Sequence, residues 1–395
     1  MTERELIRSE LQELSVEFLR SRDGVKWSRY PEPVLPAWVA DMDFQVAPAI
    51  RRRLERFVSS SDFGYTWVPA PPELIDVFVE RQKNRFGLDL ETENVVTTVT
   101  ALQGVDTAIQ LFSEPGDGVV VQTPIYPPFL AAVASTGRQL VENPLAVTDS
   151  GYELDLDSLD AVIDERTRIL LLCNPHNPTG RSFRRQELEA LAERALRHDL
   201  TIISDEIHAD LTHAPHRHTA FGSLAPEVLE RTLTVTSATK AFNLAGLPCS
   251  FTAAGSTRLR DAFRSLPDHL LAHPGALDIA ATQTAWQEGD TWLEEVLAVL
   301  ETNRRRLHDR LRAELPQVRS FLPEATYLAW IDCNELHFED RASKAFYKEG
   351  GLALHCGHDF GPPGSGCVRL NFATATSILD EMIDRLISVA RAHSG

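Results

Sequence analysis

The middle of the chain alternates short apolar stretches with a helix-like stretch, and this alternation limits the folds open to it. Four stretches rich in Val, Ile, Leu and Thr are bounded by turn residues, at 117–124, 167–175, 200–206 and 231–238. Continuously apolar strands suit a parallel sheet that is buried on both faces. Between two of them, "RRQELEALAERALRHD" places Leu and Ala at helical spacing. The pattern predicts βαβ units in an α/β domain, with helices covering a mostly parallel sheet.

The last quarter of the chain follows a different pattern. Residues 292–315 have the spacing of a long amphipathic helix, and the strand-like pieces "TYLAWID", "GLALHC" and "CVRLNFA" follow it. We therefore expect a second, smaller α+β domain. The predicted division is an N-terminal segment at 1–45 that packs with the small domain, a large domain at 46–285 and a small C-terminal domain at 286–395.

Composition excludes several classes of partner. The 395 residues carry a net charge of −18, which disfavours nucleic acids and anionic membranes because both require basic surfaces. No run of 18 apolar residues is present, and the first residues lack the apolar core of a secretory signal. The five cysteines are scattered, which fits reduced thiols. We expect a cytoplasmic protein that binds neither nucleic acid nor membranes.

One lysine stands out by its position. The chain has 34 arginines and only five lysines, and Lys240 closely follows the strand-like run "RTLTVTSA". Arginine would serve equally well in a surface salt bridge. It could not lose a proton and attack a carbonyl group, because a guanidinium stays protonated in proteins. The choice of lysine therefore favours a chemical role for this residue.

Polar residues follow three of the predicted strands where each strand ends. Asn177, Asp205, and the pair Ser237 and Lys240 occupy these positions. Ligands of open α/β sheets bind beyond the carboxyl ends of the strands, so one crevice would hold all four side chains. Pyridoxal phosphate needs an amine for a Schiff base, a carboxylate for its ring nitrogen, a donor to its ring oxygen and a cradle for its phosphate. The set suits this cofactor.

Each feature also has a simpler explanation. An Asp at a strand end commonly caps a turn, and "NPTG" is a good turn sequence. Ser-x-x-Lys is also the nucleophile motif of serine β-lactamases, but these need a downstream Lys-Thr-Gly that this chain lacks. Four histidines could suggest a metal site, yet only two of their spacings resemble ligand pairs and no cysteine joins them. We expect a polar loop and no metal at these histidines: His208, His213, His216 and His218.

Several motifs together resemble a known family. "HNPTG", "SDEIHADL", "SATKAFNLAGL" and "RLNFA" resemble the fold-type I pyridoxal-phosphate enzymes. "WVADMDF", "FGYT", "EPGDGVVVQTPIYPPF" and "LLCNPHNPTGR" resemble its MalY/PatB-type cystathionine β-lyase branch. The resemblance runs from about residue 23 to 390. It implies an aspartate aminotransferase-like fold, a pyridoxal 5′-phosphate cofactor and a homodimer with shared active sites.

The resemblance assigns roles around the cofactor ring. Lys240 would bind the cofactor covalently and then act as the base at the substrate α-carbon. Asp205 would pair with the ring nitrogen, Asn177 would hydrogen-bond the ring oxygen and Tyr126 would stack on the ring face. His208 would also contact the cofactor, at a position where related aminotransferases commonly carry Tyr.

It also assigns the phosphate and substrate contacts. Gly104 and Val105 would offer backbone N–H groups at a helix start to the phosphate, and Ser237 would add a hydroxyl. Tyr65 would reach the phosphate bound by the partner subunit. Arg369 would hold the substrate carboxylate. The cleft would also be lined by Trp38 and Ala40.

Two departures from the aminotransferase pattern favour a lyase. Pro248 stands where many aminotransferases place a phosphate-binding arginine, and His208 stands where they place Tyr. Both differences are shared with the β-lyase branch. We expect a carbon–sulfur β-lyase that cleaves cystathionine or another L-cysteine S-conjugate to a thiol, pyruvate and ammonia. The alternatives are an aminotransferase acting on an amino acid and a 2-oxo acid, and a cofactor-bound regulatory protein.

Overall fold

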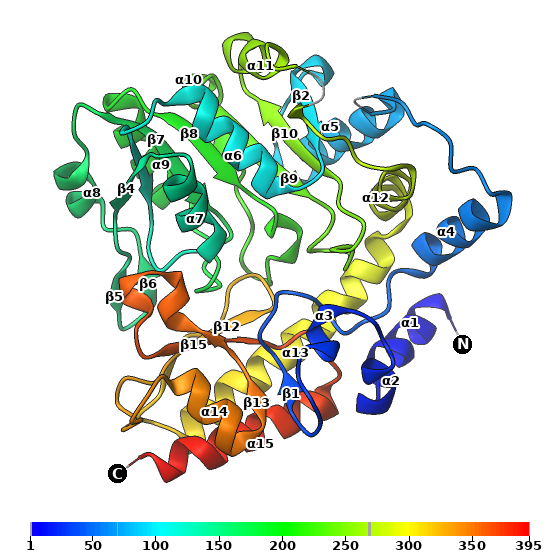
Figure 1. Cartoon of the computed structure of the whole chain (residues 1–395), viewed down its shortest axis with the longest axis vertical. Coiled ribbons are helices and arrows are strands. Elements are labelled where there is room, and N and C mark those ends of the chain that lie inside the picture. Colours follow the sequence, from blue (N-terminus) through cyan, green and yellow to red (C-terminus); the bar gives the residue numbers. More distant parts are fainter. Residues whose placement is uncertain (1, 69, 268–269, 395) are drawn as a thin grey trace.

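A seven-stranded sheet forms the centre of the larger part of the molecule (Figure 1). The computed structural model describes residues 2–68, 70–267 and 270–394. The strand order is β2-β10-β9-β8-β7-β3-β4, and β10 alone runs antiparallel to its neighbours. The strands are β2 (Val95–Thr98), β3 (Gly118–Val121), β4 (Gln139–Glu142), β7 (Thr167–Cys173), β8 (Thr201–Asp205), β9 (Thr232–Ser237) and β10 (Ser250–Ala254).

The four apolar stretches are strands of this sheet, as predicted. They form β3, β7, β8 and β9, which are adjacent and parallel. Every residue of β3 and β8 is buried, as expected of central strands covered on both faces. The carboxyl ends of β7, β8 and β9 therefore lie side by side at one edge of the sheet.

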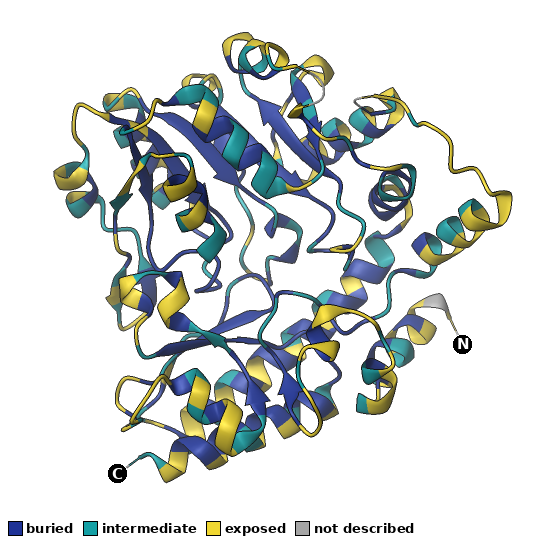
Figure 2. Ribbon diagram, in the orientation of Figure 1, coloured by how far each residue is buried: buried dark blue, intermediate teal, exposed yellow. Residues whose placement is uncertain are grey.

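Helices cover both faces of the sheet, with their buried sides inward and their exposed sides outward (Figure 2), and the buried residues of each face form an apolar core. α6 (Ala101–Phe112), α7 (Pro127–Ser135) and α11 (Thr257–Arg264) share one apolar core with the sheet. The other core contains α8 (Leu156–Val162), α9 (Arg185–Arg197) and α10 (Pro226–Leu229). The predicted helix at 184–199 is α9. A small hairpin is formed by β5 (Ala146–Thr148) and β6 (Gly151–Glu153).

A four-stranded antiparallel sheet forms the C-terminal part (Figure 1). Its order is β11-β12-β15-β14, with bounds Arg319–Ser320, Leu328–Asp332, Cys367–Asn371 and His355–Cys356. The predicted strand "GLALHC" is two short strands: β13 (Leu352–Ala353) pairs with β1 (Leu35–Pro36), and β14 pairs with β15. The predicted long helix is α13 (Asp290–Glu314). The helix α15 (Thr376–Ala392) packs against α13, and α14 (Ala342–Gly350) packs against α15 and the strands β13, β14 and β15.

The N-terminal helices lie near α13 and the C-terminal part (Figure 1). Arg4 and Arg8 of α1 both form ion pairs with Glu295 of α13, whose side chain is buried. The remaining helices are α1 (Glu3–Gln12), α2 (Val16–Arg20), α3 (Val25–Ser28), α4 (Pro48–Ser60), α5 (Pro72–Phe86) and α12 (Ala276–Glu288). Within the described ranges, no helix has the length and hydropathy needed to cross a bilayer. The domain boundaries at 45 and 285 stay a prediction.

Candidate active site

A cavity of about 540 Å³ lies beyond the carboxyl ends of β7, β8 and β9. Segments from distant parts of the chain line it, including the N-terminal segment, the start of α7 and the strands β14 and β15. The cavity brings together eight of the residues predicted for the site: Trp38, Ala40, Tyr126, Asn177, Asp205, His208, Lys240 and Arg369.

Lys240 reaches the cavity from the turn after β9. Its Nζ donates to the carbonyl oxygen of Ala40 at 2.9 Å, and the Tyr327 hydroxyl donates to the same oxygen at 3.0 Å. Burial lowers the pKa of Lys240, and Asp41 opposes this shift. The amine is therefore closer to its neutral, nucleophilic form than a surface lysine.

Asp205 closes β8 with its carboxylate in the cavity wall. Oδ1 accepts the backbone N–H of Ile207 at 3.1 Å, which fixes the side chain against the following turn. Burial raises the pKa of Asp205 to about 7. A cation placed against this carboxylate would restore its charge, and a protonated ring nitrogen is such a cation.

Arg369 and Asn177 form one hydrogen-bonded unit. Arg369 is 2% exposed, and its Nη1 donates to Asn177 Oδ1 at 2.9 Å. Its Nη2 donates to the Trp38 carbonyl oxygen and to His355 Nδ1, both at 3.0 Å. Burial lowers the pKa of Arg369 to about 10, so it stays cationic at neutral pH. The site therefore offers a fixed positive charge to an anionic ligand.

Two asparagines and one buried ion pair hold the N-terminal segment in the wall. Asn371 donates to the carbonyls of Val39 and Asp41 at 2.8 and 2.6 Å. Asn243, just after Lys240, accepts from the Met42 amide and donates to the carbonyls of Met42 and Phe44. The buried pair Lys26–Asp43 lies 2.9 Å apart. These bonds set the position of the Ala40 carbonyl that receives Lys240.

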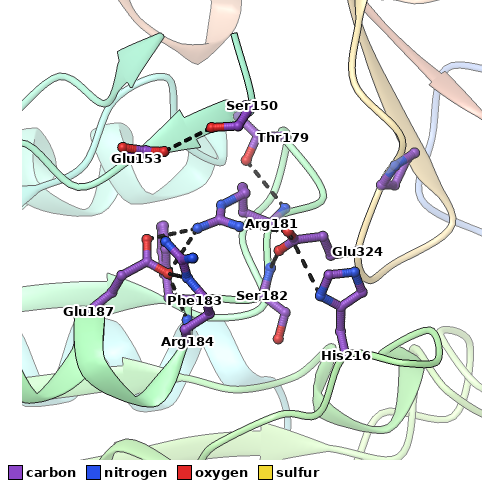
Figure 3. A network of polar contacts seen from close by, with 12 residues as sticks. Ser150, Glu153, Thr179, Arg181, Ser182, Phe183, Arg184, Glu187, His216 and Glu324 are labelled. Carbon is purple, nitrogen blue, oxygen red and sulfur yellow. Dashed lines mark hydrogen bonds and ion pairs between the residues drawn. The ribbon is translucent and has the colours of Figure 1, made fainter. Parts of the chain in front are cut away.

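A polar network fixes the loop that carries Asn177 (Figure 3). Arg181 pairs with Glu187 at 2.7 Å and with Glu324 at 2.6 Å, and Glu324 also accepts the Ser182 amide at 3.0 Å. Glu187 belongs to α9, whereas Glu324 precedes β12. The network thus ties the loop after β7 to both the large sheet and the C-terminal sheet.

Gly104 and Val105 lie one turn inside α6 and not at its start, and their predicted contacts with a phosphate stay a prediction. α6 begins at Ala101 with Thr100 as its N-cap, and the Gly104 amide already donates to the Thr100 carbonyl at 3.3 Å. Val105 is fully buried in the apolar core. Amides of a first helical turn have no intrahelical acceptor, and the Gln103 amide is taken by the Thr100 hydroxyl. The residues that line the cavity here are Thr100, Ala101 and Leu102.

Ser237 lies beneath the cavity wall. Its hydroxyl donates to the Cys249 carbonyl at 2.6 Å and accepts the Thr239 amide at 3.1 Å. Thr239, between Ser237 and Lys240, lines the cavity. The structure thus gives Ser237 a part in shaping the turn before Lys240, and its contact with a phosphate stays a prediction.

Tyr65 lies outside this cavity. It is fully exposed and belongs to the segment between α4 and α5. This segment runs along the outer side of the molecule and is drawn largely as exposed (Figure 2). Phe63 and Trp67 beside it are also exposed. Its predicted contact with a partner subunit's phosphate stays a prediction.

Two aromatic side chains of the wall pack edge-on against neighbouring rings. Tyr126 stands at the start of α7, with its ring edge-on to Phe129 at 5.5 Å between centroids. His208 is buried beside Tyr327, and burial lowers its pKa to about 3. Its Nδ1 has no hydrogen-bond partner in the described part of the chain. A neutral imidazole with a free nitrogen is therefore available to a bound group.

The other loop histidines bond to protein groups. His213 Nε2 lies 2.7 Å from the Thr326 carbonyl oxygen, and His218 Nε2 lies 2.8 Å from Glu206. Across the described residues, no group of three His, Cys, Asp or Glu side chains is arranged to hold a metal ion.

The cavity fits pyridoxal phosphate by size and by chemistry. Its volume lies within the roughly 300–1,000 Å³ typical of cofactor sites. The wall supplies a buried amine, a buried carboxylate that contacts no cation among the described residues, and the start of a helix for an anion. Together with an α/β sheet of this topology, these groups define a pyridoxal-phosphate enzyme of fold type I.

Comparisons with known proteins identify the family. The model of the class I and II aminotransferases matches residues 40–388. Cystathionine β-lyase PatB of Bacillus subtilis is 35% identical over 92% of this chain and 95% of its own, and MalY of Escherichia coli is 31% identical over 91% and 92%. The structure of cystalysin from Treponema denticola contains pyridoxal 5′-phosphate and superposes with a TM-score of 0.90, at 29% identity over 97% and 98% of the chains. The chain belongs to the class I and II aminotransferase family, as a pyridoxal-phosphate-dependent carbon–sulfur β-lyase of the MalY/PatB branch.

Proposed function

We propose that this enzyme cleaves the Cβ–S bond of cystathionine or another L-cysteine S-conjugate, and that the products are a thiol, pyruvate and ammonia. The observation that carries the proposal is the common cavity of Lys240, Asp205 and Arg369. It offers a base, an electrostatic partner for the cofactor ring and a cation for the substrate carboxylate. Support comes also from PatB, which is named a cystathionine β-lyase.

The side chains divide the work of the reaction. Arg369, buried and cationic, binds the α-carboxylate and thereby orients the Cα–H bond. When bound, pyridoxal phosphate supplies an electron sink that acidifies this bond. Nζ of Lys240 removes the α-proton. The electron pair of the Cα–H bond then forms a second bond between Cα and Cβ, and the thiolate leaves Cβ with the electron pair of the Cβ–S bond. Asp205 would hold the ring nitrogen of the bound cofactor, Asn177 its ring oxygen, and the start of α6 its phosphate.

We also propose that two chains form the working enzyme, in the cytoplasm. Tyr65 projects from the outer surface with Phe63 and Trp67, and such exposed aromatic groups are typical of protein interfaces. A partner chain would bring this tyrosine to the phosphate end of the cavity. The five cysteines are free, which suits a reducing compartment.

Product analysis over a panel of S-substituted cysteines tests the proposed reaction. With cystathionine we expect thiol and pyruvate in equal amounts, without any added 2-oxo acid. Turnover that requires a 2-oxo acid and releases no thiol would establish the aminotransferase instead. Bound cofactor with no turnover on any member of the panel would favour the regulatory alternative.

A further inference from the structure

The imidazole of His355 contacts the guanidinium that we assign to the substrate carboxylate. His355 and Arg369 are register partners in the antiparallel pair of β14 and β15. His355 Nδ1 lies 3.0 Å from Arg369 Nη2. His355 also lines the cavity, so the contact is made at the edge of the binding site itself.

The contact specifies which nitrogen of His355 carries the proton. A guanidinium has only N–H donors, so Nδ1 has to accept and the ring proton has to lie on Nε2. Nε2 faces Asp359 Oδ2 at 3.6 Å, which favours this tautomer. Burial lowers the pKa of His355 to about 4, and Arg369 acts in the same direction. The ring is therefore neutral, and an acceptor, at neutral pH.

The groups around the ring come from four elements. Asp359 and the Phe360 ring, 4.8 Å away between centroids, belong to the 3₁₀ helix Gly357–Phe360. Arg29, at the end of α3, adds a second cation that opposes protonation of His355. An outer cavity of about 320 Å³ adjoins His355, and Lys344 of α14 lines it with its amine 2.8 Å from Asp340. Asp359 and the Trp38 backbone favour the charged ring, and they are opposed by burial and by the cations Arg369 and Arg29.

The contacts of Arg369 occupy some of its N–H groups and leave others for a ligand. Both Nη2 hydrogens are taken, by the Trp38 carbonyl and by His355, and one Nη1 hydrogen is taken by Asn177. The Nε–H is buried and has no partner in the described part of the chain. The guanidinium is thus held by three acceptors, and its remaining donors are left to a ligand.

We propose that His355 is a positioning residue that fixes the Arg369 guanidinium for the carboxylate of the substrate. The inference rests on the proposed role of Arg369. It gives His355 no contact with the reacting atoms. Loss of the imidazole acceptor would let the guanidinium rotate and weaken the binding of any ligand that carries an α-carboxylate.

Ligand binding to the holoenzyme tests this role. L-alanine and ethylamine are titrated into the wild type and into His355→Leu, with the visible absorbance of the cofactor as the readout. Ethylamine has the same amine as L-alanine but lacks the carboxylate. Its Kd therefore reports any change in the reaction of the amine at the cofactor that does not involve Arg369. We expect the Kd of L-alanine to rise roughly tenfold, as for the loss of a hydrogen bond to a charged group, and the Kd of ethylamine to stay within twofold.

Two further variants separate positioning from a general structural effect. His355→Asn keeps an acceptor near the place of Nδ1 and should restore L-alanine affinity to within threefold of wild type. His358→Leu makes the same change at an exposed position nearby and should alter neither Kd. An unchanged L-alanine Kd in His355→Leu, or an equal loss of both ligands, would overturn the inference. Binding does not depend on thiol release, so a failure of the proposed lyase reaction would leave this comparison intact.

Discussion

The strand-end wall of the cavity and the segment around Tyr65 differ in almost every physical respect. Asp205 and Arg369 are 6% and 2% exposed and are held by several hydrogen bonds. Tyr65 is fully exposed, and its apolar neighbours Trp67 and Val68 are 69% and 60% exposed. One chain alone completes the first region, whereas the second exposes apolar surface that a monomer does not bury. The proposed chemistry and the proposed assembly of the site are thus separable, and variants can address them one at a time.

Removal of the amine gives the largest expected effect in the buried region. Lys240→Ala should lower kcat/KM at least about 10⁴-fold, because it removes both the attachment point and the base. Borohydride, which reduces imines, should fix cofactor to the wild-type protein and not to the variant. Lys83→Ala, which removes an exposed lysine paired with Asp89, serves as the control and should retain full activity. Cofactor fixed to the Lys240→Ala protein would contradict the assignment.

Asp205→Asn should lower the rate less than Lys240→Ala does. It should also raise the stability of the cofactor-free protein at pH 8. We expect kcat to fall about 10²–10³-fold, as when one electrostatic partner of the reacting centre is lost. In the cofactor-free protein, burial raises the pKa of Asp205 to about 7, above its ordinary 3.8. The folded state therefore binds more protons than the unfolded state between about pH 4 and 7, and stability falls as pH rises through this window.

Asparagine stays neutral between about pH 4 and 7, so the variant avoids the fall in stability that ionisation of Asp205 causes. We expect the cofactor-free variant to unfold with a free energy roughly 1–3 kcal/mol higher than wild type at pH 8, and with no gain at pH 4. Urea denaturation at the two pH values measures the difference. An equal difference at both would show that the carboxylate charge is not its cause.

Mixing two impaired variants tests whether Tyr65 serves the site of a partner chain. Tyr65→Ala should lose at least about tenfold in activity if its hydroxyl bonds a phosphate. If Tyr65 serves the partner's site, hybrids of Tyr65→Ala and Lys240→Ala contain one intact site per dimer. Refolding an equal mixture should then recover roughly a quarter of wild-type activity, since half of the dimers are hybrids with one working site of two. Activity no higher than the mean of the two variants would place Tyr65 outside the shared site.

The position of a site residue in the fold explains whether it could be predicted from the sequence. Asn177, Asp205 and Lys240 were predictable together because parallel strands bring their carboxyl ends to one edge. Gly104 was a misleading signal for the start of α6, which begins three residues earlier at Ala101. The better one was Thr100 with Gln103, an N-cap pattern that marks where α6 begins.

The remaining wall residues carry no such pattern. His355 lines the cavity and Tyr327 donates to the Ala40 carbonyl of its wall because the C-terminal part packs against the large sheet, and no spacing in the sequence encodes that contact. Their tyrosine and histidine types fit core packing equally well. Domain boundaries have the same difficulty, since α13 runs continuously between the two parts without a turn or linker to mark a limit.

The smallest expected effects come from replacing a tyrosine by phenylalanine, once in the buried region and once in the exposed segment around Tyr65. Tyr327→Phe removes a hydroxyl that donates to the Ala40 carbonyl at 3.0 Å, and Tyr65→Phe removes one that is fully exposed. In the first case a buried acceptor loses a donor, which should cost about 1 kcal/mol in unfolding free energy and a few-fold in kcat. In the second case the unfolding free energy should change by less than about 0.5 kcal/mol, while cofactor affinity falls. Denaturation and cofactor titration on the two variants measure both quantities. If Tyr65→Phe destabilised the fold as much as Tyr327→Phe, the segment around Tyr65 would be part of the folded core, and the separation of chemistry from assembly would not hold.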